Sequence, residues 1–145
     1  MLKDIEGLKK YPYGCNEQSA SRMIALLLDE SINRKLGKSV SNRDEINAMI
    51  VRLTDAQNGD GSYGWWKNGK ANPWMTNYVL HALHFAKTRG YTKASAPLQK
   101  GVVYVTNVGV YDKWNTLQKL EAINLLININ QMNLKVFILI YFISL

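Results

Sequence analysis

The chain has 145 residues, 47% of them hydrophobic, so it is long enough for one compact domain and too apolar for a disordered tail. Its 18 lysines and arginines outnumber 11 aspartates and glutamates, but these cations are spread along the chain, which argues against a nucleic-acid partner. The single cysteine, Cys15, excludes an intramolecular disulfide.

Neither end of the chain carries a recognisable export signal or membrane span. The opening segment, MLKDIEGLKK, contains acidic residues and lacks an apolar stretch of signal-peptide length. Residues 136–145 are apolar but fall short of the roughly twenty residues that a transmembrane helix needs. We therefore expect no stable membrane span.

Hydrophobic periodicity predicts two helices in the first third of the chain. Across residues 20–28 the apolar positions repeat at i, i+3, i+4, i+7 and i+8, which is typical of an amphipathic helix that directly follows Cys15. Gly37 interrupts this pattern, and Asn42 with Glu45 predicts a capping box at the start of a second helix. The buried face of this second helix is expected to contain Ile46, Met49, Ile50 and Leu53.

A third helix is predicted after a glycine-rich loop at residues 59–69. Asn72 and Pro73 have the character of its N-cap and its first-turn residue. Gly90 is expected to end the helix in a left-handed conformation. The buried face of the third helix is expected to contain Met75, Tyr78, Val79, Ala82, Leu83 and Ala86.

The rest of the chain predicts two more helices and then loses its pattern. A fourth helix is predicted from Pro97, where the apolar residues have helical spacing although several of them are β-branched. A fifth helix fits residues 116–126. We expect residues 1–128 to form one domain and residues 129–145 to be an aberrant apolar tail of the kind that truncation or a frameshift produces. Several helices, short polar connections and no strand predict an all-α fold built of antiparallel helical hairpins.

The chemistry of the chain is expected in residues 11–18, YPYGCNEQ. The Cys15 thiol stands just before a helix, where unpaired backbone N–H groups favour a thiolate, and the Gln18 carboxamide can fold back towards it. Attack of the thiolate on the carboxamide, with loss of ammonia, would leave an internal thioester, a better acyl donor than the amide. Gly14 would allow a tight turn beside the sulfur, and Pro12 would stiffen that turn.

A thioester survives only where water is kept from the acyl carbon. Aromatic side chains are expected to supply that cover: Tyr11 and Tyr13 within the motif, and Trp65, Trp66 and Trp74 further along the chain. Their shielding role is a hypothesis about packing, which the spacing alone does not fix.

These residues resemble the thioester motif of the alpha-2-macroglobulin and complement family, Gly-Cys-x-Glu-Gln, especially in its bacterial members, and Glu17 matches the motif's glutamate. DGSYGWW at residues 60–66 and PWMTNYVLHAL at residues 73–83 are similar to the family's glycine-aromatic loop and the helix that follows it. The matches keep their order and spacing from Leu8 to Gly90. Asn16 replaces the glycine of the animal motif at a position that varies in the bacterial relatives, and Met75 and Asn77 replace a leucine and an alanine. None of the three is a reacting residue.

The resemblance implies a partial α/α toroid, because the family's ring needs more helical hairpins than this chain holds. It implies a single-turnover protease trap rather than an enzyme. In such a trap, Cys15 and Gln18 would stay cross-linked until a protease cuts a bait region elsewhere in the protein. The implied partners are target proteases and the remaining macroglobulin domains of a longer protein, in the periplasm or outside the cell. No metal or cofactor is implied, and no downstream catalytic histidine is assigned.

Two other interpretations stay open. Cys15 with His81 or His84 could form the dyad of a cysteine hydrolase or transglutaminase-like enzyme, although that leaves Glu17 and Gln18 without a role. The chain could also be an inert structural fragment.

Overall fold

The computed structural model describes residues 14–107, 110 and 113–129, and the regular secondary structure of these residues is entirely helical. The predicted all-α fold is therefore confirmed. The helices, in chain order, are α2 (Asn16–Lys35), α3 (Arg43–Ala56), α4 (Pro73–Thr88), the short 3-10 helix η1 (Thr92–Ala94), α5 (Ser95–Val105) and α7 (Thr116–Asn128). The expected tail at residues 129–145 lies outside the described residues except for Ile129.

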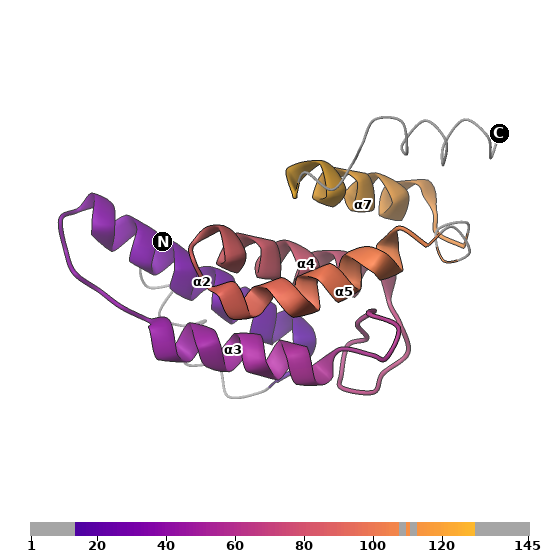
Figure 1. Cartoon of the computed structure of the whole chain (residues 1–145), viewed down its shortest axis with the longest axis horizontal. Coiled ribbons are helices and arrows are strands. Elements are labelled where there is room, and N and C mark those ends of the chain that lie inside the picture. Colours follow the sequence, from indigo (N-terminus) through magenta and orange to yellow (C-terminus); the bar gives the residue numbers. More distant parts are fainter. Residues whose placement is uncertain (1–13, 108–109, 111–112, 130–145) are drawn as a thin grey trace.

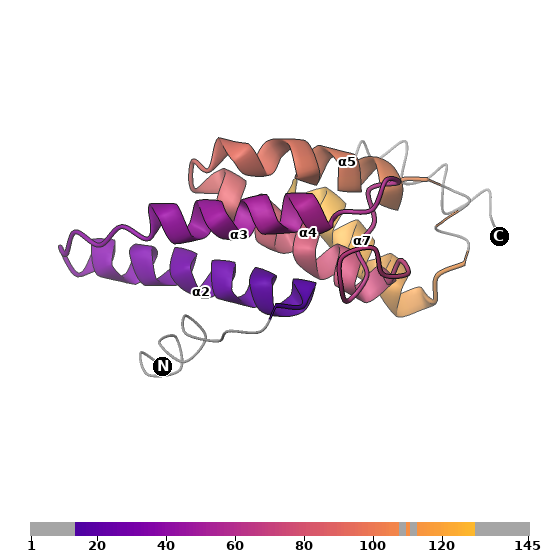
Figure 2. The ribbon, with the colours of Figure 1, turned by 90° about the horizontal axis from the view of Figure 1, so that it is seen from below.

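The helices form antiparallel hairpins, α2 with α3 and α4 with α5 (Figures 1 and 2). Helix α4 is the central element, since it packs against α2, α5 and α7. Helices α2, α4 and α7 run in the same direction, and they begin at the end of the molecule where the loop of residues 57–72 lies. This arrangement brings the start of α2, with its cysteine, next to that loop.

Local signals set the ends of α2 and α4 as predicted. Helix α2 begins directly after Cys15. At the start of α4, the Asn72 side-chain oxygen accepts a hydrogen bond from the Met75 N–H at 2.9 Å, and Pro73 is the first helical residue. Gly90, with a φ of +89°, follows the last turn in the left-handed conformation that glycine adopts without strain.

The capping box predicted at Asn42 and Glu45 is wrong. Asn42 does precede α3, but its side chain makes no cap hydrogen bond. Its amide instead donates to the Leu26 carbonyl at 3.2 Å and to an Asp29 carboxylate oxygen at 2.9 Å, while Glu45 pairs with Arg22 at 2.8 Å. Both side chains therefore join α3 to α2, because partners on the neighbouring helix outcompete the local cap.

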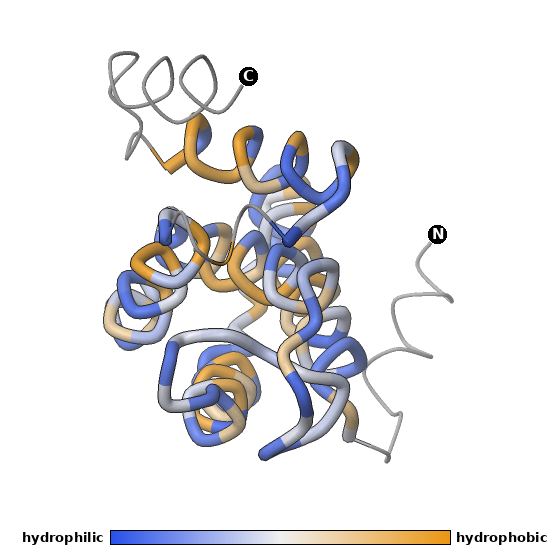
Figure 3. The backbone as a smooth tube through the Cα atoms, turned by 90° about the vertical axis from the view of Figure 1, so that its right-hand side faces the viewer, coloured by the Kyte–Doolittle hydropathy of each residue, from blue (hydrophilic) through white to orange (hydrophobic). Residues whose placement is uncertain are grey.

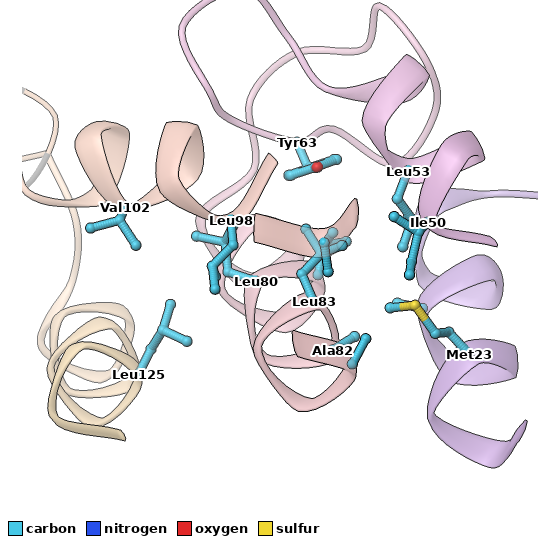
Figure 4. Close-up of a cluster of buried hydrophobic side chains, with 14 of the residues drawn as sticks. Met23, Ile50, Leu53, Tyr63, Leu80, Ala82, Leu83, Leu98, Val102 and Leu125 are labelled. Atoms are coloured by element: carbon cyan, nitrogen blue, oxygen red, sulfur yellow. The ribbon is translucent and has the colours of Figure 1, made fainter. Parts of the chain in front are cut away.

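The hydrophobic core extends through α4 from one hairpin to the other (Figure 4). Leu80 and Leu83 of α4 lie between Met23 and Ile50 on one side and Leu125 on the other. The predicted buried faces of the second and third helices are confirmed, except that Met49 and Tyr78 are only partly buried. Viewed along the helices, hydrophobic and hydrophilic residues alternate around each one, as expected where one face of a helix packs (Figure 3).

Candidate functional site

The reactive motif forms the N-terminal cap of α2. Cys15 is the N-cap residue, in an extended conformation, and the residue is only 7% exposed. Its sulfur accepts a hydrogen bond from the Gln18 backbone N–H at 3.4 Å, and the Gln18 side-chain oxygen accepts one from the Cys15 backbone N–H at 3.2 Å. This is a reciprocal capping box in which sulfur replaces the usual hydroxyl oxygen. The cap holds the thiol and the carboxamide within one turn of each other.

The hydrogen bond from the Cys15 N–H to the Gln18 side-chain oxygen has a chemical consequence. Negative charge develops on that oxygen when a nucleophile attacks the carboxamide carbon, and a preorganised N–H donor stabilises such charge. The nucleophilic sulfur belongs to the same residue as the donor. The cap therefore supplies both the nucleophile and an electrostatic partner for the electrophile, with Cys15 buried and Gln18 half-buried.

A chain of polar contacts connects the motif to α4. The Cys15 sulfur lies 4.0 Å from one Glu17 carboxylate oxygen, and the Ser21 hydroxyl donates to the other at 2.7 Å. The Ser21 hydroxyl also lies 2.8 Å from the Tyr78 hydroxyl. The sequence reasoning missed Ser21 and Tyr78. The four-residue spacing of Glu17 and Ser21 is a readable helical signal, whereas the contact with Tyr78 depends on how α2 packs on α4.

Asn16 fastens the cap to the glycine-rich loop. It is 2% exposed; its backbone N–H donates to the Trp65 carbonyl at 2.9 Å and its side-chain amide donates to the Gly64 carbonyl at 2.9 Å. A side chain at Gly64 would collide with the backbone of Gly69 and Lys70, so the loop reaches Asn16 only with glycine there. Asn16 is thus an anchor of the site.

Gly14 joins the motif to α3 through its carbonyl oxygen, which accepts a hydrogen bond from the Arg52 guanidinium at 2.7 Å. A side chain at Gly14 would meet this flexible guanidinium rather than backbone. The other predicted supporting residues of the motif, Tyr11, Pro12 and Tyr13, lie outside the described residues.

Two of the three tryptophans predicted to shield the site, Trp65 and Trp74, form a stacked group with Tyr78. Trp65 stacks on Trp74 with ring centroids 5.7 Å apart, and Trp74 stacks on Tyr78 at 5.3 Å. Trp65, Trp66 and Trp74 are nonetheless 48%, 60% and 40% exposed. The tryptophans thus lie on the surface around the site, and shielding of the acyl carbon by them stays a prediction.

His81 and His84, the alternative catalytic bases, lie along α4. Among the described residues, the hydrogen-bond partners of the Cys15 thiol are Gln18 and Glu17, and neither histidine is one of them. Burial, together with the charge of His84, lowers the pKa of His81. Burial and Lys87 lower the pKa of His84. A cavity of about 140 Å³ beside His81 is lined by that residue and by Trp74, Asn77, Tyr78, Glu121 and Asn124.

The described residues form neither a metal site nor a membrane-spanning helix. No cluster of three or more histidine, cysteine, aspartate or glutamate side chains is placed there to hold a metal ion. None of the helices in this part of the chain is both long enough and apolar enough to cross a bilayer.

The chain is similar in sequence to a family of known proteins. The family model of the A-macroglobulin TED (thioester-containing) domain matches residues 1–126. The alpha-2-macroglobulin of Thermotoga maritima is 34% identical over 102 residues, covering 70% of this chain and 6% of that protein. The alpha-2-macroglobulin of Escherichia coli is 32% identical over 103 residues, covering 67% of this chain and 6% of that protein.

A solved structure shows the same fold. It is a crystal structure of native alpha-2-macroglobulin from Escherichia coli spanning domain MG7 to the C-terminus, and it superposes with a TM-score of 0.78 at 24% identity. The superposition covers 96% of this chain and 25% of that one, whereas the chain spans only about 6% of the full length of its curated relatives. The predicted α/α toroid is the fold of the matched domain. Because the family model matches residues 1–126, the chain belongs to the A-macroglobulin thioester-domain family and covers a fragment of that domain.

Proposed function

We propose that this chain is the acylating module of a longer protease inhibitor, and that its functional group is a thioester between Cys15 and Gln18. One observation carries the proposal: the thiol and the carboxamide of these residues are held in a single capping box by hydrogen bonds of 3.4 and 3.2 Å. The family supports it, since its members are protease inhibitors rather than enzymes.

The chemistry follows in two steps. The Cys15 sulfur attacks the side-chain carbonyl carbon of Gln18, a sulfur–carbon bond forms, and the amide nitrogen departs as ammonia. The Cys15 N–H stabilises the charge that develops on the carbonyl oxygen. A nucleophile of the target later attacks the same carbon and displaces the Cys15 sulfur. The target is then covalently bonded to the side-chain carbonyl carbon of Gln18, and Cys15 is a free thiol. The thioester is consumed, so each molecule acts once.

Capture of a protease requires more than this module. We propose that the bait region lies in other domains of the longer protein, that target proteases are the acceptors, and that the protein acts in the periplasm or outside the cell. The chain's relatives are long macroglobulins, of which it spans about 6%.

Intact mass spectrometry tests the proposal. A thioester lowers the mass by one ammonia, and methylamine should then add one equivalent while one thiol becomes titratable. The matched control is Gln18→Glu, which retains a residue suited to the capping box but removes the carboxamide that the thiol attacks. The proposal would be contradicted if the unaltered chain had the mass expected without loss of ammonia, carried a titratable thiol from the outset and took up no methylamine.

The competing hydrolase hypothesis predicts a different pattern. A hydrolase would turn over an acyl substrate repeatedly, lose that activity on Cys15→Ala, and keep it on Gln18→Ala. A single-turnover acylating module shows no repeated turnover and needs both residues.

A further inference from the structure

Glu17 lies between the reacting sulfur and a pair of hydroxyl groups, and its two carboxylate oxygens have different partners. Oε2 is 4.0 Å from the Cys15 sulfur, and Oε1 accepts a hydrogen bond from the Ser21 hydroxyl at 2.7 Å. Ser21 has only one hydroxyl proton, which it gives to Glu17. Tyr78, 2.8 Å from Ser21, must therefore donate to the Ser21 oxygen. The chain of donors runs from Tyr78 through Ser21 and ends on Glu17, leaving Oε2 free to accept a proton.

Thioester formation needs such an acceptor. The thiol must lose a proton before sulfur can attack, and the amide nitrogen must gain one, because an amide anion is a very poor leaving group. In the described part of the chain, the other hydrogen-bond partner of the sulfur is the Gln18 N–H, which is a donor and cannot take a proton. The Glu17 carboxylate is the partner that can.

We infer that Glu17 transfers the proton from the Cys15 thiol to the Gln18 amide nitrogen during thioester formation; this inference rests on the proposed function. Ser21 and Tyr78 are the positioning residues that hold the Glu17 carboxylate towards the sulfur. Glu17 takes the proton from the Cys15 thiol as the sulfur–carbon bond forms. It returns that proton to the Gln18 amide nitrogen as the carbon–nitrogen bond breaks, and ammonia leaves. Glu17 ends as a carboxylate, so one proton is relayed and no outside reagent is needed.

The full chain is first treated with ammonia in denaturant, which opens the thioester and restores the Cys15 thiol and the Gln18 amide. The ammonia is then removed, and the reaction is followed as the chain refolds. Loss of titratable thiol and release of ammonia are measured against time. Glu17→Gln is expected to slow both by about 100-fold, the usual size of a general acid–base contribution. Ser21→Ala and Tyr78→Phe are expected to slow them by about 3- to 10-fold, because each leaves the carboxylate in place but less well oriented.

Chemical rescue separates a proton carrier from a residue that merely supports the fold. Glu17→Ala opens space at the site, and added formate should restore a substantial part of its rate, whereas chloride at the same concentration should not. The matched control is Tyr104→Phe, which removes a tyrosine hydroxyl from α5 and should leave the rate unchanged, because Tyr104 is not among the hydrogen-bond partners of Glu17 or Ser21 in the described residues.

The outcomes distinguish the inference from the function on which it rests. If the unaltered chain releases no ammonia, the thioester proposal itself fails. If the unaltered chain forms the thioester and a folded Glu17→Gln variant does so equally fast, Glu17 is not the proton carrier, although the thioester stands. An unchanged rate in Tyr78→Phe would remove the positioning role of that hydroxyl.

Discussion

Helices α2 and α7 start with the same local structure and differ in what surrounds it. The N-cap residues Cys15 and Asn115 have φ and ψ of −72° and 166° and of −73° and 168°, and each forms a reciprocal capping box with a glutamine three residues on. The hydrogen bonds are 3.4 and 3.2 Å at Cys15 and 2.9 and 3.0 Å at Asn115. Cys15 is buried, whereas Asn115 is exposed.

The comparison separates geometry from chemistry. A favourable N-cap residue with glutamine at the third helical position suffices to fold the side chains back on one another in both helices. At α2 the capping atom is a sulfur nucleophile, and Asn16 fastens the cap to the glycine-rich loop. The proposed thioester therefore depends on a capping box that both helices share, together with two features found at α2, namely the Cys15 thiol and its burial.

The largest effect is expected when the thiol alone is removed from the α2 cap. Cys15→Ser should abolish both the loss of ammonia and the uptake of methylamine. It should change the free energy of unfolding by only about 1 kcal/mol, because serine is a favourable N-cap residue. Mass spectrometry and urea denaturation measure the two quantities. Methylamine uptake by the serine variant would show that the acyl group is elsewhere.

The converse experiment gives a thiol to the exposed cap. Asn115→Cys, made together with Cys15→Ser, places cysteine three residues before Gln118 in the matching backbone conformation. We expect a titratable thiol and no stable thioester, because water reaches this cap and would convert a thioester into a free thiol and a carboxylate at position 118. A stable thioester at α7 would mean that burial is unnecessary and that the local spacing alone produces the chemistry.

A smaller effect is expected from releasing the α2 cap from its loop. Asn16→Ala removes a buried hydrogen bond and leaves the Gly64 carbonyl without its partner, so the free energy of unfolding should fall by about 1–3 kcal/mol. The matched control, Asn115→Ala, loses an exposed cap and should cost about 1 kcal/mol. An Asn16→Ala variant that unfolds at the same urea concentration as the unaltered chain would indicate that the loop contact adds nothing to the stability of the α2 cap.

The smallest predicted effect concerns His81, which lies one turn beyond Tyr78 on α4. Burial lowers its pKa in the folded state below the ordinary value of 6.5, so the unfolded chain binds the proton more readily. The stability due to the neutral imidazole is present above pH 6.5 and is lost as the pH falls through the lower folded value. The unfolding temperature of the unaltered chain should drop more steeply on acidification than that of His81→Gln. The same dependence of unfolding temperature on pH in both proteins would contradict a contribution from His81.

The sequence predicted those features that a few neighbouring residues determine. The start of α4 at Asn72 and Pro73 and the left-handed Gly90 after its end depend on backbone geometry within one turn. The closeness of Cys15 and Gln18 follows for the same reason. The Asn115 capping box was equally readable, since it has the right residues at the right spacing, but it was not predicted.

Features that depend on contacts between helices were not predictable from spacing. Asn42 and Glu45 have a capping-box pattern, but their side chains bind residues of α2 instead. Tyr78 meets Ser21 across a separation of 57 residues, which only the packing of α4 on α2 produces. The exposure of the tryptophans likewise depends on how the loop lies against the helices rather than on their order in the chain.

The most direct measurement is peptide-level mass spectrometry of the chain after treatment with methylamine and then a thiol-alkylating reagent. The account predicts that the peptide containing Cys15 and Gln18 carries a methylamide on Gln18, and that Cys15 is alkylated only after methylamine has acted. Alkylation of Cys15 before any treatment, with Gln18 recovered as an unmodified amide, would contradict it.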